Sequence, residues 1–475
     1  MKHKTKILAT LGPSSEEKSE IEALAEAGMN IARLNFSHGS YEQFKKIVEN
    51  IREVEQKRDA EKNPILILQD LQGPKIRIGK LPESGVLVKK GQEITLDLGL
   101  KKMSGEIIPL PFPTLAKELK VGDRLLIEDG LIRTQILAIK GKKILAKVIS
   151  GGWIKSHKGV NFPDTQRGKL NPLTPKDKKD LAFGVKELKV DAVAISFVEE
   201  AEDIIRIRTR IQKMQSKAVF LIAKIERPKA LLNLEKILAV ADGLMIARGD
   251  LGVEIPAEQV PLEQKRIIQV CRNAGKPVIV ATQILQSMTE NPIATRAEIS
   301  DAATAIFEQT DAYMLSNETA TGQYPTKAVQ TLARVANVTE KAMEKTDGFL
   351  KSPYPLGDMN GSSEDHHMAR EAYELSQEIK ADALVIATEE GYTAQAIIRY
   401  RPKTPLIIVS NKASTLRFLH FYWGVEKTIK IKGRLELENI ENELKKNPAL
   451  KGLKRVIFIH LGKVKRTLVV MDLGK

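Results

Sequence analysis

Short apolar runs alternate with amphipathic stretches along most of the chain, and this alternation predicts its architecture. Runs typical of buried parallel strands fall at residues 5–10, 29–36, 64–70, 192–197, 218–225, 243–247, 277–282 and 312–315. Helical spacing follows most of these strands. Eight strand–helix units, about 250 residues in total, predict an α/β fold of the (β/α)8 TIM-barrel type.

The first predicted helix has signals at both ends. Ser14 and Glu17 have the spacing of a capping box, which predicts that the helix begins there. Gly28 stands where a helix C-terminus needs a left-handed residue. Between them, four apolar positions recur at helical spacing and predict the buried face: Ile21, Leu24, Ala25 and Ala27.

The strand–helix pattern stops at Gly73-Pro74 and resumes near residue 173. The segment between is rich in Val, Ile, Leu and Lys with regular glycines, which is typical of a small β-barrel. Residues 346–365 predict a linker, and strands expected at 383–388, 406–410, 455–460 and 467–471 alternate with helices. We therefore expect a barrel domain (1–73 and 172–345), an inserted β-barrel domain (74–171) and a C-terminal open α/β domain (346–475).

The net charge is unevenly distributed. Lys and Arg number 75 against 60 Asp and Glu, a difference of +15, and residues 74–171 carry nineteen basic against nine acidic residues, or +10 of that excess. Such a segment fits an anionic partner, either a polymer or a phosphorylated small molecule. Few aromatic residues are present there to stack on bases, chiefly Phe112, Trp153 and Phe162, so we expect no nucleic acid partner.

The sequence predicts a soluble cytoplasmic protein without a membrane partner. No apolar run approaches the roughly eighteen residues of a bilayer helix, and the N-terminal residues lead directly into a strand. Cys271 is the only cysteine, so an internal disulfide is excluded and a reducing compartment fits best.

Polar side chains at the strand ends suggest where the chemistry lies, because the carboxyl ends of barrel strands form the active-site mouth. Alternation puts Arg33, Asn35 and Ser37 on one face of the second strand, a set that an anion and a cation together would satisfy. The alternative is a polar strand end whose groups satisfy one another.

The fifth and sixth strands end in charged residues. Lys224 and Glu226 share a face, and Asp250 follows the sixth strand. Two carboxylates suit a hard divalent cation such as Mg²⁺, while free backbone N–H groups of the turn at 248–250 could hold a carboxylate or phosphate. The alternative is that Lys224 and Glu226 only pair with neighbours. Thr282 and Ser316 close the last two strands, where a lone hydroxyl more often caps a helix.

These residues resemble those of the pyruvate kinase family, in the family's order and spacing over nearly the whole chain. The resemblance rests on Asn35-Phe36-Ser37-His38-Gly39, Gly73-Pro74, Ile76-Arg77, Lys158-Gly159-Val160-Asn161, Lys224-Ile225-Glu226, residues 247–254, Ala281-Thr282-Gln283 and residues 316–320. It implies phosphoryl transfer from phosphoenolpyruvate to ADP, giving pyruvate and ATP in glycolysis. It also implies a lid role for the insertion and a homotetramer.

The resemblance also implies roles for single residues. Arg33 binds the substrate phosphate, and Lys224 stabilises the transferring phosphoryl group and the developing enolate. The backbone amides of Gly249 and Asp250 bind the substrate carboxylate, and Thr282 lies where carbon is protonated through a water that Ser316 and Glu318 order. Glu226 and Asp250 hold Mg²⁺, for which Mn²⁺ can substitute. The nucleotide contacts fall to Asn35, Phe36, Ser37, His38, Arg77 and Lys158.

The chain departs from the family pattern in two places. Many members bind K⁺ between Asn35, Ser37, Asp70 and the carbonyl at Leu71, with a glutamate at the position of Lys75. A lysine ammonium would supply the same charge as K⁺, so we expect an enzyme with no K⁺ requirement. In the C-terminal domain, Glu390 replaces a serine of the family's effector-phosphate loop, which argues against sugar-bisphosphate activation.

Two further alternatives remain. A catalytically silent member would keep the fold, although Arg33, Lys224, Glu226, Asp250 and Thr282 are all present. Another enzyme of phosphoenolpyruvate on a similar barrel would not need the basic lid residues.

Overall fold

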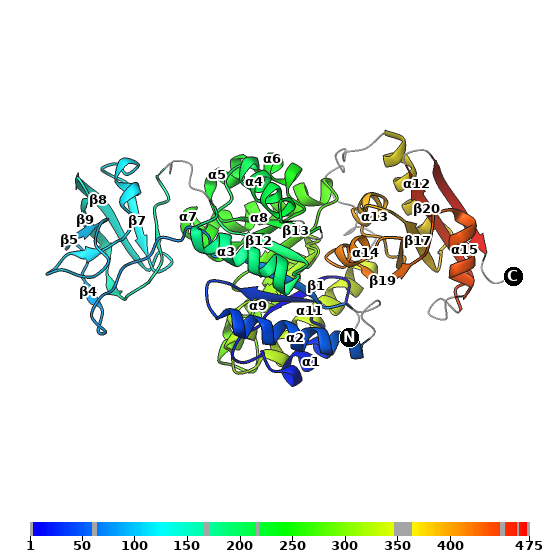
Figure 1. The fold of residues 1–475 in the computed structure, drawn as a ribbon, viewed down its shortest axis with the longest axis horizontal. Helices are drawn as coiled ribbons and strands as arrows, with labels where there is room; N and C mark the ends of the chain where they lie inside the picture. Colours follow the sequence, from blue (N-terminus) through cyan, green and yellow to red (C-terminus); the bar gives the residue numbers. More distant parts are fainter. Residues whose placement is uncertain are drawn as a thin grey trace.

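The central domain is a closed barrel of eight parallel strands. The computed structural model describes residues 3–58, 64–165, 172–214, 218–345, 363–446, 452–462 and 465–472. The strands run in the order β1-β16-β15-β14-β13-β12-β3-β2 around the barrel, which confirms the predicted TIM barrel. The barrel domain lies between the insertion and the C-terminal domain in Figure 1. The bounds of the strands are β1 (Lys6–Thr10), β2 (Ile31–Asn35), β3 (Leu66–Asp70), β12 (Ala192–Ile195), β13 (Phe220–Ile225), β14 (Gly243–Ala247), β15 (Val278–Ala281) and β16 (Ala312–Leu315).

Helices surround the barrel. They are α1 (Lys18–Ala27), α2 (Tyr41–Lys57), α3 (Pro175–Phe183), η2 (Gly184–Leu188), α4 (Ala201–Gln212), α5 (Pro228–Leu232), α6 (Leu234–Val240), α7 (Arg248–Glu254), η3 (Ala257–Gln259), α8 (Val260–Asn273), η4 (Gln286–Thr289), α9 (Arg296–Phe307), α10 (Asn317–Ala320) and α11 (Pro325–Lys345). None of the helices in the described part of the chain combines the length and apolar character that crossing a bilayer requires.

The predicted start of α1 is wrong, whereas its end is confirmed. The helix begins at Lys18 with Glu17 as N-cap and no side-chain capping bond. The residues before it form a separate turn, in which the Ser15 N–H donates to the Gly12 carbonyl at 2.8 Å, so the chain is not yet helical at Ser14. Gly28 ends the helix with φ 127°, a conformation that favours glycine.

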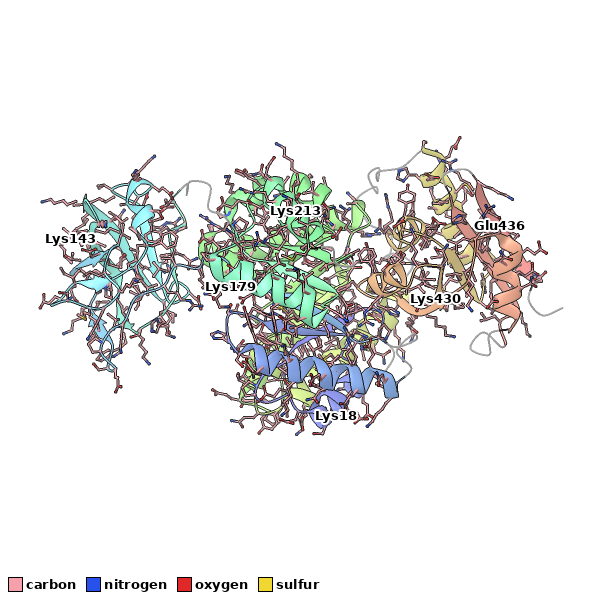
Figure 2. The ribbon with its side chains drawn as sticks, in the orientation of Figure 1. Lys18, Lys143, Lys179, Lys213, Lys430 and Glu436 are labelled. Atoms are coloured by element: carbon pink, nitrogen blue, oxygen red, sulfur yellow. The ribbon has the colours of Figure 1, made fainter. Side chains whose placement is uncertain are left out.

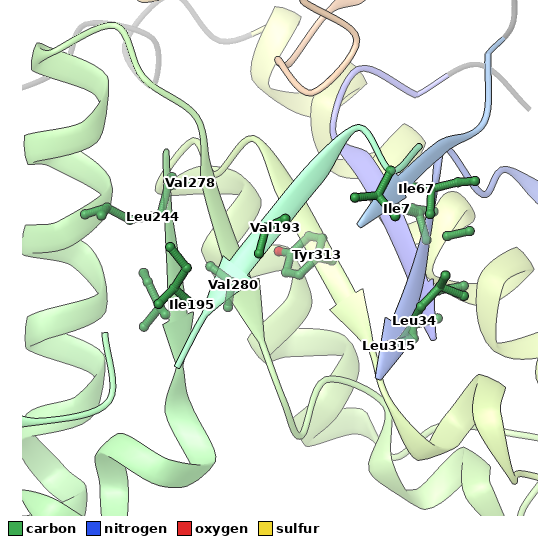
Figure 3. Close-up of a cluster of buried hydrophobic side chains, with 14 of the residues drawn as sticks. Ile7, Leu34, Ile67, Val193, Ile195, Leu244, Val278, Val280, Tyr313 and Leu315 are labelled. Atoms are coloured by element: carbon green, nitrogen blue, oxygen red, sulfur yellow. The ribbon is translucent and has the colours of Figure 1, made fainter. Parts of the chain in front are cut away.

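Strand residues alternate between two hydrophobic layers. Side chains that face the helices form one cluster, and Figure 3 shows its members Ile7, Leu34, Val193, Val280 and Tyr313 between strands and helices. The residues between them in sequence, such as Leu8, Leu68 and Met314, point into the barrel. The same parity carries the polar residues at the carboxyl ends of the strands to the inside of the barrel mouth.

The insertion is a curled, mainly antiparallel unit beside the barrel, at the left of Figure 1. Six strands pair in the order β11-β7-β8-β9-β5-β6, and β10 pairs separately with β4. Side chains fill it as a cluster of its own that includes Leu96, Leu125 and Phe162. The elements are β4 (Val86–Val88), β5 (Glu93–Asp97), β6 (Ile108–Pro109), η1 (Pro113–Lys117), β7 (Arg124–Ile127), β8 (Ile132–Lys140), β9 (Lys143–Ser150), β10 (Gly152–Ile154) and β11 (Val160–Asn161).

The C-terminal domain is a five-stranded sheet in the order β19-β18-β17-β20-β21, which confirms the predicted α/β unit and adds β19 to the four expected strands. Its elements are α12 (Ser363–Glu378), β17 (Ala383–Ala387), α13 (Tyr392–Ile398), β18 (Leu406–Ser410), α14 (Ala413–Leu419), β19 (Val425–Lys430), α15 (Leu437–Lys446), β20 (Arg455–Leu461) and β21 (Arg466–Asp472). Most of the predicted linker lies outside the described residues, and α12 begins at Ser363. The three domain boundaries stay predictions.

Helix α14 and the residues after it close the amino-terminal end of the barrel. Phe220, the first residue of β13, stacks on Phe421 with ring centroids 5.3 Å apart. Arg417 of α14 forms ion pairs with Asp191 at 2.6 Å and Glu55 at 2.7 Å. The inner barrel residues and the C-terminal domain therefore share one hydrophobic cluster.

Candidate active site

A polar cavity of about 180 Å³ lies at the carboxyl ends of the barrel strands, on the side of the insertion. It is lined by Arg33, Asn35, Ser37, His38, Asp70, Gln72, Lys75, Arg77, Ser196, Phe197, Lys224, Glu226 and Asp250. Ten of these thirteen residues were predicted from the sequence. The period-2 parity of β2 and β13 brings them together, as predicted for Arg33, Asn35, Ser37, Lys224 and Glu226.

A buried chain of charges crosses the floor of the cavity. Asp70 Oδ2 accepts from Arg33 Nε at 2.8 Å, and Asp70 Oδ1 lies 3.3 Å from Lys224 Nζ. Lys224 Nζ also lies 2.8 Å from Glu226 Oε1. The four side chains are no more than 12% exposed. One carboxylate thus holds two cations at fixed positions facing the cavity.

The protonation of these groups follows from their neighbours. Burial by itself would lower the pKa of Lys224, but Asp70, Glu226 and Asp250 outweigh it and raise that pKa above its ordinary value. Burial also opposes ionisation of Asp70, yet Lys224 and Arg33 hold its pKa below the usual range. Lys224 therefore stays protonated at neutral pH and acts as a fixed positive charge rather than as a base.

Further evidence of an anion site comes from His38. Burial, with the charges of Arg77, Arg33, Lys176 and Lys75 in addition, lowers the pKa of its imidazole. A histidine surrounded by cations stays neutral, and the same field attracts phosphate groups.

The two carboxylates predicted to bind metal line the same cavity. Burial raises the pKa of Glu226, the charge of Asp250 adds to this, and Lys224 offsets them only in part. Asp250 Oδ1 is 3.1 Å from Lys75 Nζ. Hard oxygen donors that repel each other and are each balanced by a lysine fit a divalent cation. No group of three or more His, Cys, Asp or Glu that could bind a metal occurs in the described residues, so substrate and water oxygens would complete the coordination.

Lys75 enters the cavity but has a different partner from the one the sequence suggested. Its ammonium pairs with Asp250. Of the expected K⁺ ligands, the Leu71 carbonyl accepts from Ser196 Oγ at 2.7 Å and Asn35 Oδ1 accepts from the Ser37 N–H at 3.1 Å. The charge of Lys75 is therefore in the cavity, beside Asp250 rather than beside these oxygens.

Thr282 and Gly249 are not among the residues that line the cavity, and they contact each other just after β15 and β14. The Gly249 N–H, expected to bind a substrate carboxylate, donates to Thr282 Oγ1 at 2.8 Å. Thr282 Oγ1 in turn donates to the Ala281 carbonyl at 2.6 Å. The ends of β14 and β15 are thereby joined through the hydroxyl that the sequence singled out.

Several predicted residues lie away from the cavity lining. The Phe36 ring is buried and stacks on Phe44 with centroids 4.2 Å apart, so only its backbone can meet a nucleotide. Lys158, on the insertion, pairs with Glu128 at 2.5 Å. The buried Glu318 carboxylate accepts from the N–H groups of Leu285 at 3.1 Å and Ser316 at 2.7 Å. Glu318 thus fixes two loops instead of facing the cavity.

Sequence reasoning missed Gln72, which lines the cavity, and three residues that contact its charged side chains. Thr10, at the end of β1, accepts from Arg33 Nη1 at 2.8 Å, and Ser196, after β12, accepts from Lys224 Nζ at 2.8 Å. The Phe197 N–H donates to Glu226 Oε2 at 2.8 Å. Reading the ends of all eight strands would have found the two hydroxyls, whereas a backbone donor leaves no signal in sequence.

The effector-loop position in the C-terminal domain carries an ion pair. Glu390 pairs with Lys412, and Arg466 Nε donates to Asp365 Oδ1 at 2.5 Å. Lys463, a basic residue near Arg466 in the sequence, lies outside the described residues.

Comparisons with known proteins identify the family. Residues 2–329 match the family model "Pyruvate kinase, barrel domain", and residues 366–467 match "Pyruvate kinase, alpha/beta domain". The chain belongs to the pyruvate kinase family. It is therefore a phosphotransferase, and the predicted family, fold and enzyme class are confirmed.

The likeness extends over most of the length of known pyruvate kinases. One from Geobacillus stearothermophilus is 41% identical over 431 residues, covering 90% of this chain and 71% of that protein. One from Agrobacterium vitis is 43% identical over 429 residues, covering 89% and 86%. The crystal structure of a pyruvate kinase from Cryptosporidium parvum aligns with a TM-score of 0.88 at 33% identity, over 99% of this chain and 96% of that one.

Proposed function

We propose that this pyruvate kinase transfers the phosphoryl group of phosphoenolpyruvate to ADP in the polar cavity, with Mg²⁺ and without K⁺. The observation that carries the proposal is the placement of Arg33 and Lys224 on the two oxygens of Asp70. Phosphoryl transfer asks the protein chiefly for positioning and for positive charge about the transferred group. Two buried cations on one carboxylate provide both.

Each of these groups has its own role in the proposed reaction. Arg33 binds the substrate phosphate, and Lys224, whose pKa is raised, remains charged and stabilises the moving phosphoryl group and the enolate left behind. The Gly249 N–H exchanges its bond to Thr282 for the substrate carboxylate. The Thr282 oxygen, whose proton stays on the Ala281 carbonyl, can then accept a hydrogen bond from a water and direct it to the carbon that becomes the methyl group of pyruvate.

Glu226 and Asp250 would hold the Mg²⁺ ion, or Mn²⁺ in its place. When bound, the ion neutralises charge on the substrate oxygens. Lys75 lies beside Asp250 and provides a permanent positive charge in the cavity where other family members recruit K⁺.

The insertion acts as a lid that binds the nucleotide. Arg77 is anchored to the insertion by a bond from Nη1 to the His157 carbonyl at 2.9 Å while its side chain lines the cavity. With Lys158 and the polar groups of residues 35–38, it would bind the ADP phosphates. We propose a cytoplasmic homotetramer that works in glycolysis and binds neither nucleic acid nor membrane.

The test is pyruvate formation from phosphoenolpyruvate and ADP in tetramethylammonium buffer with Mg²⁺, with and without KCl. We expect equal turnover in both, and none after EDTA treatment. The Lys75→Glu variant should require KCl, because it loses the permanent charge, while the exposed Lys80→Glu control should not. Turnover of the wild type only with KCl would contradict the role of Lys75. No turnover by folded protein in any buffer would favour a silent family member.

A further inference from the structure

Arg248 binds the main chain at the end of β15. Its Nη2 donates to the carbonyl oxygens of Thr282 and Gln283, each at 3.0 Å, and its Nε lies 3.3 Å from the first of these. Thr282 and Gln283 have φ values of 69° and 54°. Because a β-branched residue rarely adopts this left-handed conformation, Thr282 needs outside contacts to keep it.

Two helices hold the guanidinium from its other side. Arg248 Nη1 donates to Asp301 Oδ1 of α9 at 2.9 Å and lies 3.3 Å from Gln264 Oε1 of α8. The Gln264 amide is itself oriented by Glu308, which accepts from Nε2 at 2.8 Å. The Arg248 side chain is only 11% exposed. The guanidinium is thus held at both edges, so the positions of α8 and α9 determine the position of the strained turn.

Two neighbouring residues, Arg248 and Gly249, therefore both form hydrogen bonds to Thr282. Arg248 binds its carbonyl, and the Gly249 N–H binds its hydroxyl at 2.8 Å. When the Gly249 N–H turns to a substrate carboxylate, two contacts remain: the bond from Arg248 to the Thr282 carbonyl and the bond from the Thr282 hydroxyl to the Ala281 carbonyl. The Ala281 carbonyl belongs to the same stretch of chain as Thr282, so the direction of the hydroxyl then depends on Arg248.

We propose that Arg248 is a positioning residue for the proton transfer to the enolate carbon. It holds Thr282 in its left-handed conformation so that the hydroxyl faces that carbon. The inference rests on the proposed role of Thr282. The Arg248 guanidinium is bound by the Thr282 and Gln283 carbonyls, Gln264 and Asp301, so it acts on the turn and not on the phosphate or the nucleotide.

The first test is Arg248→Lys, since an ammonium cannot reproduce the planar fork that spans two carbonyls and a carboxylate. We expect kcat to fall about 100-fold, the size of effect that a misplaced group produces. The KM for ADP should be unchanged. Exchange of the pyruvate methyl protons with D₂O, followed by NMR, should fall by the same factor, because it reports the proton transfer without nucleotide.

A double-mutant cycle separates positioning from general damage. Arg248→Lys combined with Thr282→Ala should be no slower than Thr282→Ala alone, because the arginine acts through that threonine. Asp301→Asn, at a carboxylate 39% exposed, provides a second variant that keeps the fold and should show a smaller loss of the same kind. The inference would be overturned if the kcat losses of the two single variants multiplied in the double variant. It would also be overturned if the kcat of each variant only followed its fraction of folded protein.

The matched control is Arg208→Lys. Arg208 Nη2 donates to the Val240 carbonyl and to Asp242 Oδ2, both at 2.9 Å, at the opposite end of β14. It should leave turnover unchanged, and an equal loss there would overturn the inference. If Thr282→Ala alone turns over normally, the proposed role of Thr282 fails together with the inference. If Thr282→Ala is slow and Arg248→Lys is not, only the inference fails.

Discussion

Asp70 is the residue at which the charges of the cavity converge. It is 2% exposed, and its two oxygens bind different cations, Arg33 and Lys224. A buried carboxylate between two cations compensates both, so its removal leaves two positive charges in a poorly solvated place. The arrangement that suits the substrate phosphate thus depends on one negative charge for its stability.

We predict that Asp70→Asn lowers the free energy of unfolding by about 3–5 kcal/mol at pH 7, the cost of breaking a buried ion pair. Urea denaturation measures it. Asp164→Asn, which breaks the exposed pair with Arg124, is the control and should cost at most about 1 kcal/mol.

The difference should vanish in acid. Arg33 and Lys224 lower the folded-state pKa of Asp70, so its contribution is complete above the unfolded value of about 3.9 and is lost as the pH falls through the folded value. If the difference in unfolding free energy between the wild type and Asp70→Asn stayed constant down to pH 2, the variant would act by some means other than the lost charge.

The residues of the site could be predicted where side chains of unlike chemistry share a strand face. Arg33 with Asn35, and Lys224 with Glu226, are improbable on an inner barrel face without a function. Thr10 and Ser196 could be found only by their place at strand ends, and their type adds nothing, because a single hydroxyl there is equally consistent with a helix cap. The pairing of Lys75 with Asp250 joins residues 175 positions apart and depends on the path of the insertion.

Strands could be predicted from the sequence where both of their faces are buried. The eight barrel strands are continuous apolar runs, since both faces are covered. β19 was missed because it is an edge strand with exposed Glu426 and Lys427, which dilute the apolar pattern. The start of α1 was misplaced because a turn precedes the helix, and serines favour turns as well as caps.

The turn after β3 is a test of element geometry. Gly73 has φ 67°, and a Cβ there would lie 2.8 Å from the Phe197 ring and 3.0 Å from Ser196 Cβ. We predict that Gly73→Ala costs about 1–2 kcal/mol for the left-handed conformation and a further 1–3 kcal/mol for the clash. Chemical denaturation would measure both together.

The control for this variant is Gly91→Ala. Gly91 has φ 86°, but a Cβ there meets nothing within 4 Å, so only the conformational cost applies. Gly73→Ala should also lower turnover, because Ser196 and Phe197 contact Lys224 and Glu226. Equal stability losses in the two variants would show that Phe197 moves aside freely.

On the scale of the whole molecule, Lys6 joins the barrel to the C-terminal domain. Its ammonium is buried and donates to the Val425 carbonyl of β19 at 2.6 Å. Burial lowers the pKa of Lys6 to about 8. The unfolded chain, with a pKa of about 10.4, binds more protons between these values, so this residue makes stability rise with pH there.

We predict that the stability advantage of Lys6→Met over the wild type shrinks by about 3 kcal/mol between pH 8 and 10.5. Urea unfolding at the two pH values measures this. The exposed Lys18→Met variant should follow the wild type at both. An equal change in unfolding free energy with pH in the wild type and in Lys6→Met would mean that the ammonium does not titrate in this range.

The C-terminal domain and the insertion are attached to the barrel in mechanically different ways. The first shares a hydrophobic core with it, whereas the second lies to one side of it (Figure 1) and contacts it through polar groups such as Asn161, which donates to Glu254 of α7 at 2.7 Å. A narrow polar contact can work as a pivot, about which displacement grows with distance. Lys143, at the outer end of the insertion in Figure 2, would move far for a small rotation. Arg77, close to the cavity, would move least, so its charge would reach the cavity with little positional error.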